Sequence, residues 1–423
     1  MLSTECLALV KSHFEFSPVG ESVGNLTIGR ARAPVGALGP NPAHVAIFVA
    51  LIENKIASGS LGVKECEKLA SLFKIIEVQK IALVLYIDSA GARVSEGLVA
   101  LGAFRHMYRA AVSASSAGVP ITVFCGANCF GGASMLAALA SKRVYSANTR
   151  FAMSGPSILA QAAGFSALDE AFIAMSMAAI SGASRAKLGD AEMMTTNATA
   201  MVAPVGVDSV AVDRHNLLGA RLAQMKSAAR PGRTEQIERK DLVKLYPQGY
   251  RLEEHNGVLR GEAQCDGRSV TLAGFIGGGA LGAERAWAQA DAIWKMLPGD
   301  TATATPPATL HLLVDCDSHA TTLDDERIML SAYLADLACA LHALARAGTH
   351  IETTVLGKLG GGVYVALASP VARVNMLYGS EIQLLPGRAI ASILGEAAMQ
   401  KHDFTDYKLS RVADHELKLG VVW

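Results

Sequence analysis

Two glycine pairs, Gly131-Gly132 and Gly361-Gly362, lie 230 residues apart, and each follows a short β-rich run and precedes a helix of small residues. At this offset nine of the forty positions 117–156 are identical, where a composition this rich in Ala and Gly would give about three by chance. The sequence therefore predicts two copies of one unit, each with a glycine-rich turn at the same corner. In the first copy the identical residues are Ala117, Gly118, Ile121, Gly131, Gly132, Ala138, Arg143, Val144 and Pro156.

Such corners could stabilise an oxyanion. A thioester oxygen becomes negatively charged when the α-carbon loses carbon dioxide or a proton, and it then needs two N–H donors about 2.7–3.1 Å away. Glycine lets the backbone approach the ligand, and a helix N-terminus adds partial positive charge. Gly131 and Gly132, together with Gly91 and Ala92 at the end of a neighbouring strand, would supply one donor from each corner. The alternative is that these glycines only permit tight turns.

Five polar side chains near the corners have both a chemical and a structural interpretation. Arg93 could anchor a carboxylate or phosphate, or could be solvated at a helix start. Ser134 could touch substrate or cap the following helix. Lys358 could hold an anion or be simply exposed, and Glu96 suits the first turn of a helix in any case. His319 could act as an acid or base, although a structural role is the more common one.

The hydrophobic pattern predicts alternating strands and helices, and hence parallel sheets with right-handed crossovers. In the first copy we expect strands at 81–87, 121–125, 143–145 and 150–153, helices at 95–117 and 133–140, and a loop at 126–132. In the second copy we expect strands at 310–314 and 351–356, a helix at 324–347, a loop at 357–362 and then a short helix.

A polar stretch with a Pro-Gly breaker, residues 227–236, separates the two copies. We place a boundary near residue 232, which gives an N-terminal domain of residues 1–232 and a C-terminal domain of residues 233–423. A chain of 423 residues is long enough for two domains with cores of their own.

Charge and cysteine usage exclude several classes of function. Lys plus Arg and Asp plus Glu both number 38, so no basic field for nucleic acid or an anionic membrane is expected. The N-terminus does not resemble a signal peptide, and no apolar run could span a bilayer, so we expect a soluble, cytoplasmic protein. The seven cysteines are scattered, and the one close pair, Cys125 and Cys129, has no zinc-ligand partners nearby. We expect buried, reduced thiols and no metal.

Three motifs of the first half belong together: Asp88-Ser-Ala-Gly-Ala-Arg-Val-Ser-Glu-Gly97, Cys129-Phe-Gly-Gly132 and Ser154-Gly-Pro156. They resemble the carboxyltransferase branch of the crotonase superfamily, in particular the β subunit of biotin-independent malonate decarboxylase. From about residue 255 the chain resembles the γ subunit, through Leu312-Leu-Val-Asp315, Gly357-Lys-Leu-Gly-Gly-Gly362 and Leu385-Pro-Gly387. The order is that of a β–γ fusion.

The resemblance implies two tandem crotonase-like ββα-spiral domains. It also implies decarboxylation of a malonyl group carried as a thioester on CoA or on the phosphopantetheine-type arm of an acyl carrier protein. Carried over by position, Gly91, Ala92, Gly131 and Gly132 would hold the thioester oxygen, and Gly361 with Gly362 would form a second oxyanion hole. Arg93, Ser134 and Lys358 are the candidate substrate-binding side chains. No metal, biotin or tightly bound cofactor is expected, and the family suggests a homo-oligomer.

The chain also departs from the family. Acidic residues usual after Ser-Gly-Pro are replaced at Ser157, Ala160 and Ala162, and the segment from Asp315 to His319 lacks the usual Asp-x-Pro-Gly turn. Two alternatives to the decarboxylase remain. One is a carboxyltransferase that uses carboxybiotin, for which biotin would have to come on a partner because the chain lacks a Met-Lys-Met biotin-carrier segment. The other is a non-catalytic scaffold that binds an acyl carrier protein.

Overall fold

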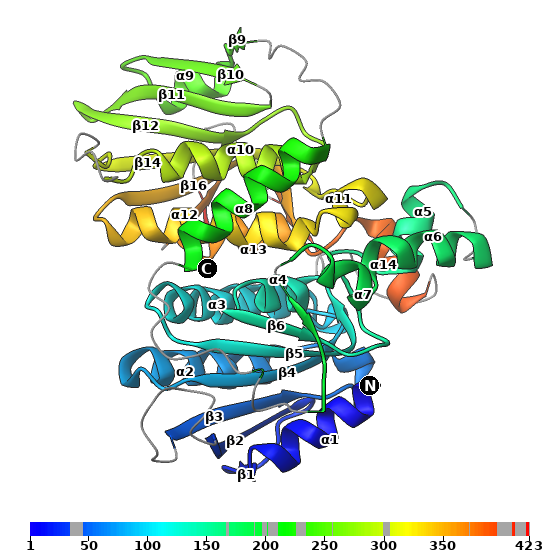
Figure 1. Ribbon diagram of the computed structural model, residues 1–423. Helices are drawn as coiled ribbons and strands as arrows, with labels where there is room; N and C mark the ends of the chain where they lie inside the picture. Colours follow the sequence, from blue (N-terminus) through cyan, green and yellow to red (C-terminus); the bar gives the residue numbers. More distant parts are fainter. Residues whose placement is uncertain are drawn as a thin grey trace. The chain divides into compact units, whose positions relative to one another are not determined.

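The computed structural model describes residues 1–33, 45–165, 169–189, 191–196, 201, 210–225, 234–255, 257–298, 305–371, 373–395, 408–410 and 420–422. They form two compact units (Figure 1). The first comprises Met1–Arg214 together with Thr321–Ala335, and the second comprises His215–Ala320 together with Asp336–Trp423. The predicted boundary near residue 232 lies outside the described residues, so domains of 1–232 and 233–423 stay a prediction.

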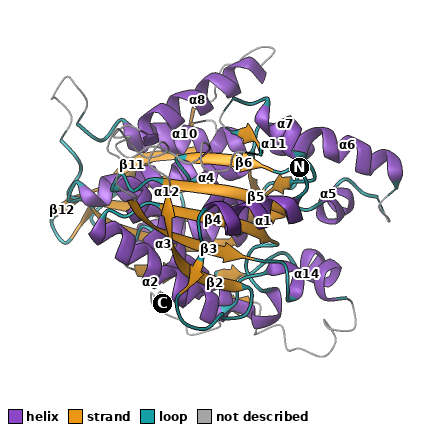
Figure 2. Ribbon diagram, turned by 60° about the horizontal axis from the view of Figure 1, so that its bottom comes forward, coloured by secondary structure: helices purple, strands orange, loops and turns teal. Residues whose placement is uncertain are grey.

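The sheet of the first unit is antiparallel at its start and parallel from β3 onward. Figures 1 and 2 show β3 to β6 side by side in this sheet. Its order is β1 (Ser17–Pro18), β2 (Leu26–Ala33), β3 (Val45–Ile52), β4 (Leu83–Ser89), β5 (Ile121–Phe130), β6 (Lys142–Tyr145) and β8 (Glu192–Met193), while β7 (Arg150–Ala152) pairs with β5. Every residue of β4 is buried, as its continuous apolar run predicts.

Helices supply the rest of this unit. Helix α1 covers one face of the sheet, where Cys6, Val10 and Phe14 pack against Val84 and Phe124. The helices are α1 (Ser3–His13), α2 (Val63–Gln79), α3 (Gly97–Ser116), α4 (Gly132–Ala138), α5 (Pro156–Ala162), α6 (Glu170–Ile180), α7 (Gly182–Ala186) and α11 (Leu323–Arg327), with 3-10 turns η2 (Ala57–Gly59) and η3 (Val94–Glu96). The predicted helix at 95–117 corresponds to α3.

The second unit holds a larger sheet. Its order is β19 (Lys408–Ser410), β18 (Glu381–Gln383), β16 (His350–Gly360), β14 (Thr309–Cys316), β12 (Arg268–Phe275), β11 (Val258–Cys265), β10 (Tyr250–His255) and β9 (Thr234–Gln236), while β17 (Arg373–Met376) pairs with β16 and β20 (Gly420–Val422). A small separate sheet joins β13 (Ala280–Leu281) to β15 (Ser318–His319). The helices are α9 (Lys240–Leu245), α10 (Ala283–Trp294), α13 (Gly361–Ala368) and α14 (Gly387–Leu394), while α8 (Val210–Met225) and α12 (Leu330–Arg346) have residues in both units.

The pairing of strands repeats between the units. Strand β5 pairs first with β6 and then, toward its end, with β7, and β16 pairs with β17 and then with β18 in the same way. The register between the central strands shifts after Ile87 in the first unit and after Val314 in the second. Gly131 and Gly361 then have nearly the same backbone angle, with φ of 55° and 53°. The repeat seen in the sequence is therefore a repeat of structure.

Three of the expected elements differ from those in the structure. The predicted loop at 126–132 is mostly strand, because the Asp88 carboxylate accepts hydrogen bonds from the N–H groups of Ala127 and Asn128 and β7 pairs with the last residues of β5. The predicted loop at 357–362 is likewise strand up to Gly360. The predicted helix at 324–347 is divided into α11 and α12 at Met329, whose φ of 68° no helix accommodates.

Six of the seven cysteines are buried, as predicted, and Cys265 is half-buried; none of them forms a disulfide among the described residues. Burial raises the pKa of Cys6 to about 12 and that of Cys316 to about 11, so these thiols are protonated near neutral pH. In the part of the chain that the structure describes, no helix combines the length and the apolar character that a membrane span requires.

The side chain of His215, in α8, lies between two carboxylates of the second unit. The His215 ring stacks on Trp287 with centroids 5.3 Å apart, and its Nδ1 lies 2.7 Å from Asp336 Oδ2. Its Nε2 lies 3.5 Å from Asp291 Oδ1, and Trp294 Nε1 donates to the other oxygen of Asp336. Burial acts to lower the pKa of His215, but the hydrogen bonds and charges of Asp336 and Asp291 outweigh it and raise the pKa.

This arrangement predicts a pH-dependent stability of the second unit. A histidine whose pKa is raised on folding contributes stability that is complete below its unfolded pKa of about 6.5 and is lost as the pH rises through the folded value. Thermal unfolding followed across pH 5–9 should therefore show stability falling on the alkaline side. In His215→Phe, which keeps the stacking and removes the charge, that fall should be absent. An equal fall in the variant would contradict this role.

Candidate active site

The first glycine corner brings two turns into direct contact. Gly91 has φ of 93°, and a Cβ placed on it would lie 2.9 Å from Phe130 O and 3.0 Å from Gly132 N. A side chain at position 91 would therefore stand directly over the Gly132 N–H. The left-handed backbone and the close approach each require glycine there.

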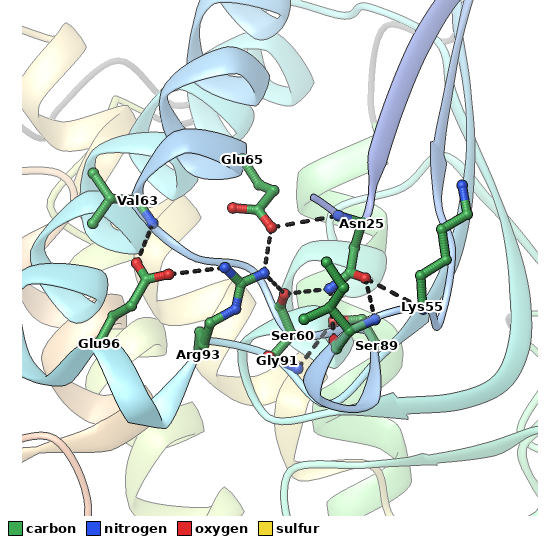
Figure 3. A network of polar contacts seen from close by, with 10 residues as sticks. Asn25, Lys55, Ser60, Val63, Glu65, Ser89, Gly91, Arg93 and Glu96 are labelled. Carbon is green, nitrogen blue, oxygen red and sulfur yellow. Dashed lines mark hydrogen bonds and ion pairs between the residues drawn. The ribbon is translucent and has the colours of Figure 1, made fainter. Parts of the chain in front are cut away.

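Hydrogen bonds occupy only some of the backbone N–H groups at this corner. The Gly131 N–H donates to the carbonyls of Ala152 and Met153, at N···O distances of 3.1 and 3.2 Å. The Gly91 N–H donates to Ser89 Oγ at 3.1 Å (Figure 3). The N–H groups of Ala92 and Gly132 have no acceptor among the described residues. Of the four residues predicted for the first hole, Gly91 and Gly131 shape the turns, while Ala92 and Gly132 present donors.

Arg93 is held by protein groups on several sides (Figure 3). Its guanidinium donates to Glu96 Oε1 and to the Ser60 carbonyl, at 2.8 Å each, and forms an ion pair with the buried Glu65. Burial acts to lower the pKa of Arg93, whereas hydrogen bonds and charge from Glu65 and Glu96 raise it. This network joins the start of α2 to the first corner. The geometry favours a structural role for Arg93 over the predicted anchoring of substrate, which stays a prediction.

Glu96 does cap a helix, but a neighbouring one. Its Oε2 accepts the Val63 N–H at the start of α2 at 2.8 Å, and it makes no side-chain cap for α3. The expected capping by Ser134 is wrong, because α4 begins after Gly131 without a side-chain cap. The fully buried Ser134 hydroxyl instead donates to the Gly131 carbonyl at 2.8 Å. Ser134 thus supports the turn, and its contact with substrate stays a prediction.

The second corner has the same backbone but different neighbours. The bridge between Leu61 and Ala92 in the first unit corresponds to the pairing of Leu281 with His319 in the second. Ser318 and His319 therefore occupy the positions that Gly91 and Ala92 have in the first unit. This match needs an offset of 227 residues, whereas the glycine pairs match at 230.

Side chains consequently pack against the second corner. A Cβ placed on Gly361 would lie 2.6 Å from Ser318 Oγ and 3.2 Å from His319 Nδ1. A Cβ on Gly131 in the first unit would have no neighbour closer than 3.6 Å. Ser318 and His319 are both buried, and burial lowers the pKa of His319 to about 4, so its ring is neutral near pH 7. The predicted second hole at Gly361 and Gly362 is thus more closed than the first.

Lys358 lies near the end of β16, two residues before Gly360. Its N–H donates to Asp315 Oδ1 at 2.9 Å, matching the bonds that Asp88 accepts in the first unit. The Lys358 ammonium is half exposed and lies 3.4 Å from Asp317 Oδ1. Binding of an anionic substrate by Lys358 stays a prediction, since a carboxylate already faces it.

Comparison with known proteins agrees with this fold. Residues 45–211 match the family model described as Carboxyl transferase domain. This range contains the first corner, and the chain has a carboxyltransferase-type, crotonase-like α/β fold. The predicted resemblance to carboxyltransferases is confirmed at this level, while the assignment to fused malonate decarboxylase subunits stays a prediction. No curated protein matches the chain.

Solved structures of several carboxyl-group enzymes resemble the chain. Transcarboxylase 12S is 16% identical over 94% of this chain and 79% of its own, with a TM-score of 0.37. A Pseudomonas malonate decarboxylase hetero-tetramer in complex with malonate is 18% identical over 55% of this chain and 94% of its own, with a TM-score of 0.43. The β subunit of geranyl-CoA carboxylase from P. aeruginosa is 15% identical over 95% and 77%, with a TM-score of 0.37.

Proposed function

We propose that this protein decarboxylates a malonyl-type thioester to the acetyl-type thioester and carbon dioxide. The observation that carries the proposal is the difference between the two corners. A Cβ placed on Gly131 would meet no atom closer than 3.6 Å, whereas one placed on Gly361 would lie 2.6 Å from Ser318 Oγ and 3.2 Å from His319 Nδ1. One open corner suits a reaction that develops negative charge on one oxygen.

The reaction follows from these two donors. The thioester oxygen accepts hydrogen bonds from Ala92 and Gly132, and the bond between the α-carbon and the carboxylate then breaks. Carbon dioxide leaves, and the electron pair forms an enolate whose charge lies on the thioester oxygen. Protonation of the α-carbon gives the acetyl thioester. Donors fixed in advance stabilise this charge without reorganising, and removing one typically costs about 10²–10³-fold in kcat. No nucleophile is required.

The fixed geometry has identifiable supports. The carbonyls of Ala152 and Met153 hold Gly131, and Ser89 holds Gly91, so the two turns stay in register with each other. Orientation of the reacting bond against a prepared site accounts for much of the rate in reactions of this kind. Binding of the thioester on CoA or on a carrier protein, action without biotin or another tightly bound cofactor, and a homo-oligomeric state belong to the same proposal.

Carboxyl transfer is the second candidate, and the match of residues 45–211 to the Carboxyl transferase domain favours it. Transfer to or from carboxybiotin develops charge on a second substrate, for which related enzymes use a second oxyanion hole. The side chains packed against Gly361 argue against that use here. The carrier-protein scaffold is favoured only by the absence of acidic residues at Ser157, Ala160 and Ala162.

Addition of biotin separates these candidates. Purified protein is incubated with malonyl-CoA or malonyl-loaded carrier protein, with and without free biotin, and the thioesters are followed by mass spectrometry. We expect acetyl thioester to form at the same rate in both cases. If the malonyl thioester were consumed only when biotin is present, with carboxybiotin as a product, the protein would be the transferase instead. Intact malonyl thioester in every sample would contradict both enzymes.

A further inference from the structure

A fully buried ion pair contacts residues 151–154, the segment that pairs with Gly131 at the first corner. Arg185 of α7 and Glu326 of α11 have no exposed side-chain surface, and Arg185 Nη2 lies 3.2 Å from Glu326 Oε2. Arg185 Nε and Nη2 also donate to the Phe151 carbonyl, at 2.9 and 2.8 Å. A third bond joins Arg185 to the Glu326 carbonyl. These groups therefore tie α11 to the end of β7.

The same carboxylate holds the residues that follow β7. Glu326 Oε1 accepts the Ser154 N–H at 3.0 Å, and the Met153 N–H is a further backbone donor to it. Burial raises the pKa of Glu326 to about 7, while Arg185 and these backbone donors act to lower it. The charge of this carboxyl therefore depends on the partners that surround it.

A short path of hydrogen bonds connects Glu326 to the corner. Met153, whose N–H meets the carboxylate, offers its carbonyl to the Gly131 N–H at 3.2 Å, and Ala152 offers its own at 3.1 Å. Gly131 is the residue before Gly132. Arg185 and Glu326 thus hold residues 151–154, and the carbonyls of this segment fix the turn that orients the Gly132 N–H.

We propose that Glu326, brought to the first unit by the segment Thr321–Ala335, is a positioning residue for the Gly132 donor. The inference rests on the proposed function and adds that the corner in the first half of the sequence is completed by a residue from the second half. The fully buried Glu326 would act through the backbone of Met153 and Ser154. Buried ion pairs seldom add stability over apolar pairs of the same size, so a role in fixing local geometry accounts better for this one.

Glu326→Gln tests the positioning, because it keeps the size of the side chain and removes its charge. We expect kcat for the malonyl thioester to fall roughly 10–100-fold, the range that a small misplacement can cause, with KM within about twofold. The matched control is Asp336→Asn, which breaks the buried pair with His215 in the second unit. The control should lower the unfolding temperature and leave kcat unchanged. A normal kcat in Glu326→Gln would overturn the proposal.

A paired substitution covers the case in which the single variant does not fold. Arg185→Met combined with Glu326→Leu removes both charges together, which buried pairs tolerate. The Ser154 N–H still loses its acceptor, so kcat should stay low in the refolded double variant. Recovery of the wild-type kcat would overturn the positioning role.

Amide hydrogen exchange gives a readout that does not depend on turnover. In Glu326→Gln, peptides covering residues 130–136 and 151–156 should exchange faster than in the wild type, and peptides of the second unit should not change. This holds even if the wild type leaves malonyl thioesters intact, in which case the proposed function fails and the positioning stands. Unchanged exchange in both peptides would overturn the positioning whatever the activity.

Discussion

Gly91→Ala is expected to lower kcat for the malonyl thioester by about 100-fold or more, the loss that follows when one oxyanion donor is removed. The new methyl group would lie 3.0 Å from Gly132 N, in the space that the thioester oxygen needs. It would also lie 2.9 Å from Phe130 O, so a loss of stability of about 1–3 kcal/mol accompanies the substitution. Steady-state kinetics and thermal unfolding measure the two effects separately.

Gly164→Ala is the matched control. Gly164 has φ of 85°, close to that of Gly91, but a Cβ there would meet nothing within 4 Å. The Gly164→Ala substitution should introduce similar backbone strain and leave kcat unchanged. Gly132 is a poorer target, because a Cβ on it would lie 2.4 Å from the ring of Phe104 and disturb the core. Wild-type kcat in Gly91→Ala would rule out the Gly132 N–H as an oxyanion donor.

Asp88→Ala is expected to combine a large loss of stability with a loss of activity. The buried Asp88 carboxylate accepts the N–H groups of Ala127 and Asn128 at 3.0 and 3.1 Å. Leaving both donors without an acceptor costs about 1–3 kcal/mol each, so the free energy of unfolding should fall by roughly 2–6 kcal/mol. Because these residues lead directly to Gly131, kcat should fall as well.

The repeat supplies the control for Asp88. Asp315 has the same place in the second unit, where it accepts the Lys358 N–H at 2.9 Å. Asp315→Ala should lower stability less than Asp88→Ala, because the Lys358 N–H is exposed and water can replace the carboxylate, and it should leave kcat unchanged. If kcat fell equally in both variants, the second corner would take part in the reaction, and the account of a single open corner would be wrong.

Much of the fold could be predicted from local patterns. The continuous apolar run before Asp88 predicts a buried strand because parallel strands are covered on both faces. The apolar face of residues 95–117 predicts α3. The repeat of glycine pairs predicts the two matching corners, because a backbone with positive φ needs glycine and so marks the sequence.

The features that were missed depend on contacts between distant residues. Strand β5 continues past Cys125 because Asp88, about forty residues earlier, supplies acceptors to Ala127 and Asn128. The sequence shows that Asp88 and Asp315 are related by an offset of 227 residues rather than 230, but that offset alone does not predict the packing of Ser318 against Gly361. Glu326 meets Ser154 across 172 residues, and no periodicity signals a contact of that range.

Decarboxylation in deuterium oxide tests the central claim most directly. Malonyl-CoA and malonyl-loaded carrier protein are incubated without biotin, and the products are analysed by mass spectrometry at short times, before the α-hydrogens of the substrate exchange. An enolate formed at the first corner must take its new proton from the solvent. We predict acetyl thioester carrying one deuterium in the wild type and at least about 100-fold slower formation of this product in Gly91→Ala. Malonyl thioester recovered intact from the wild type would contradict the account.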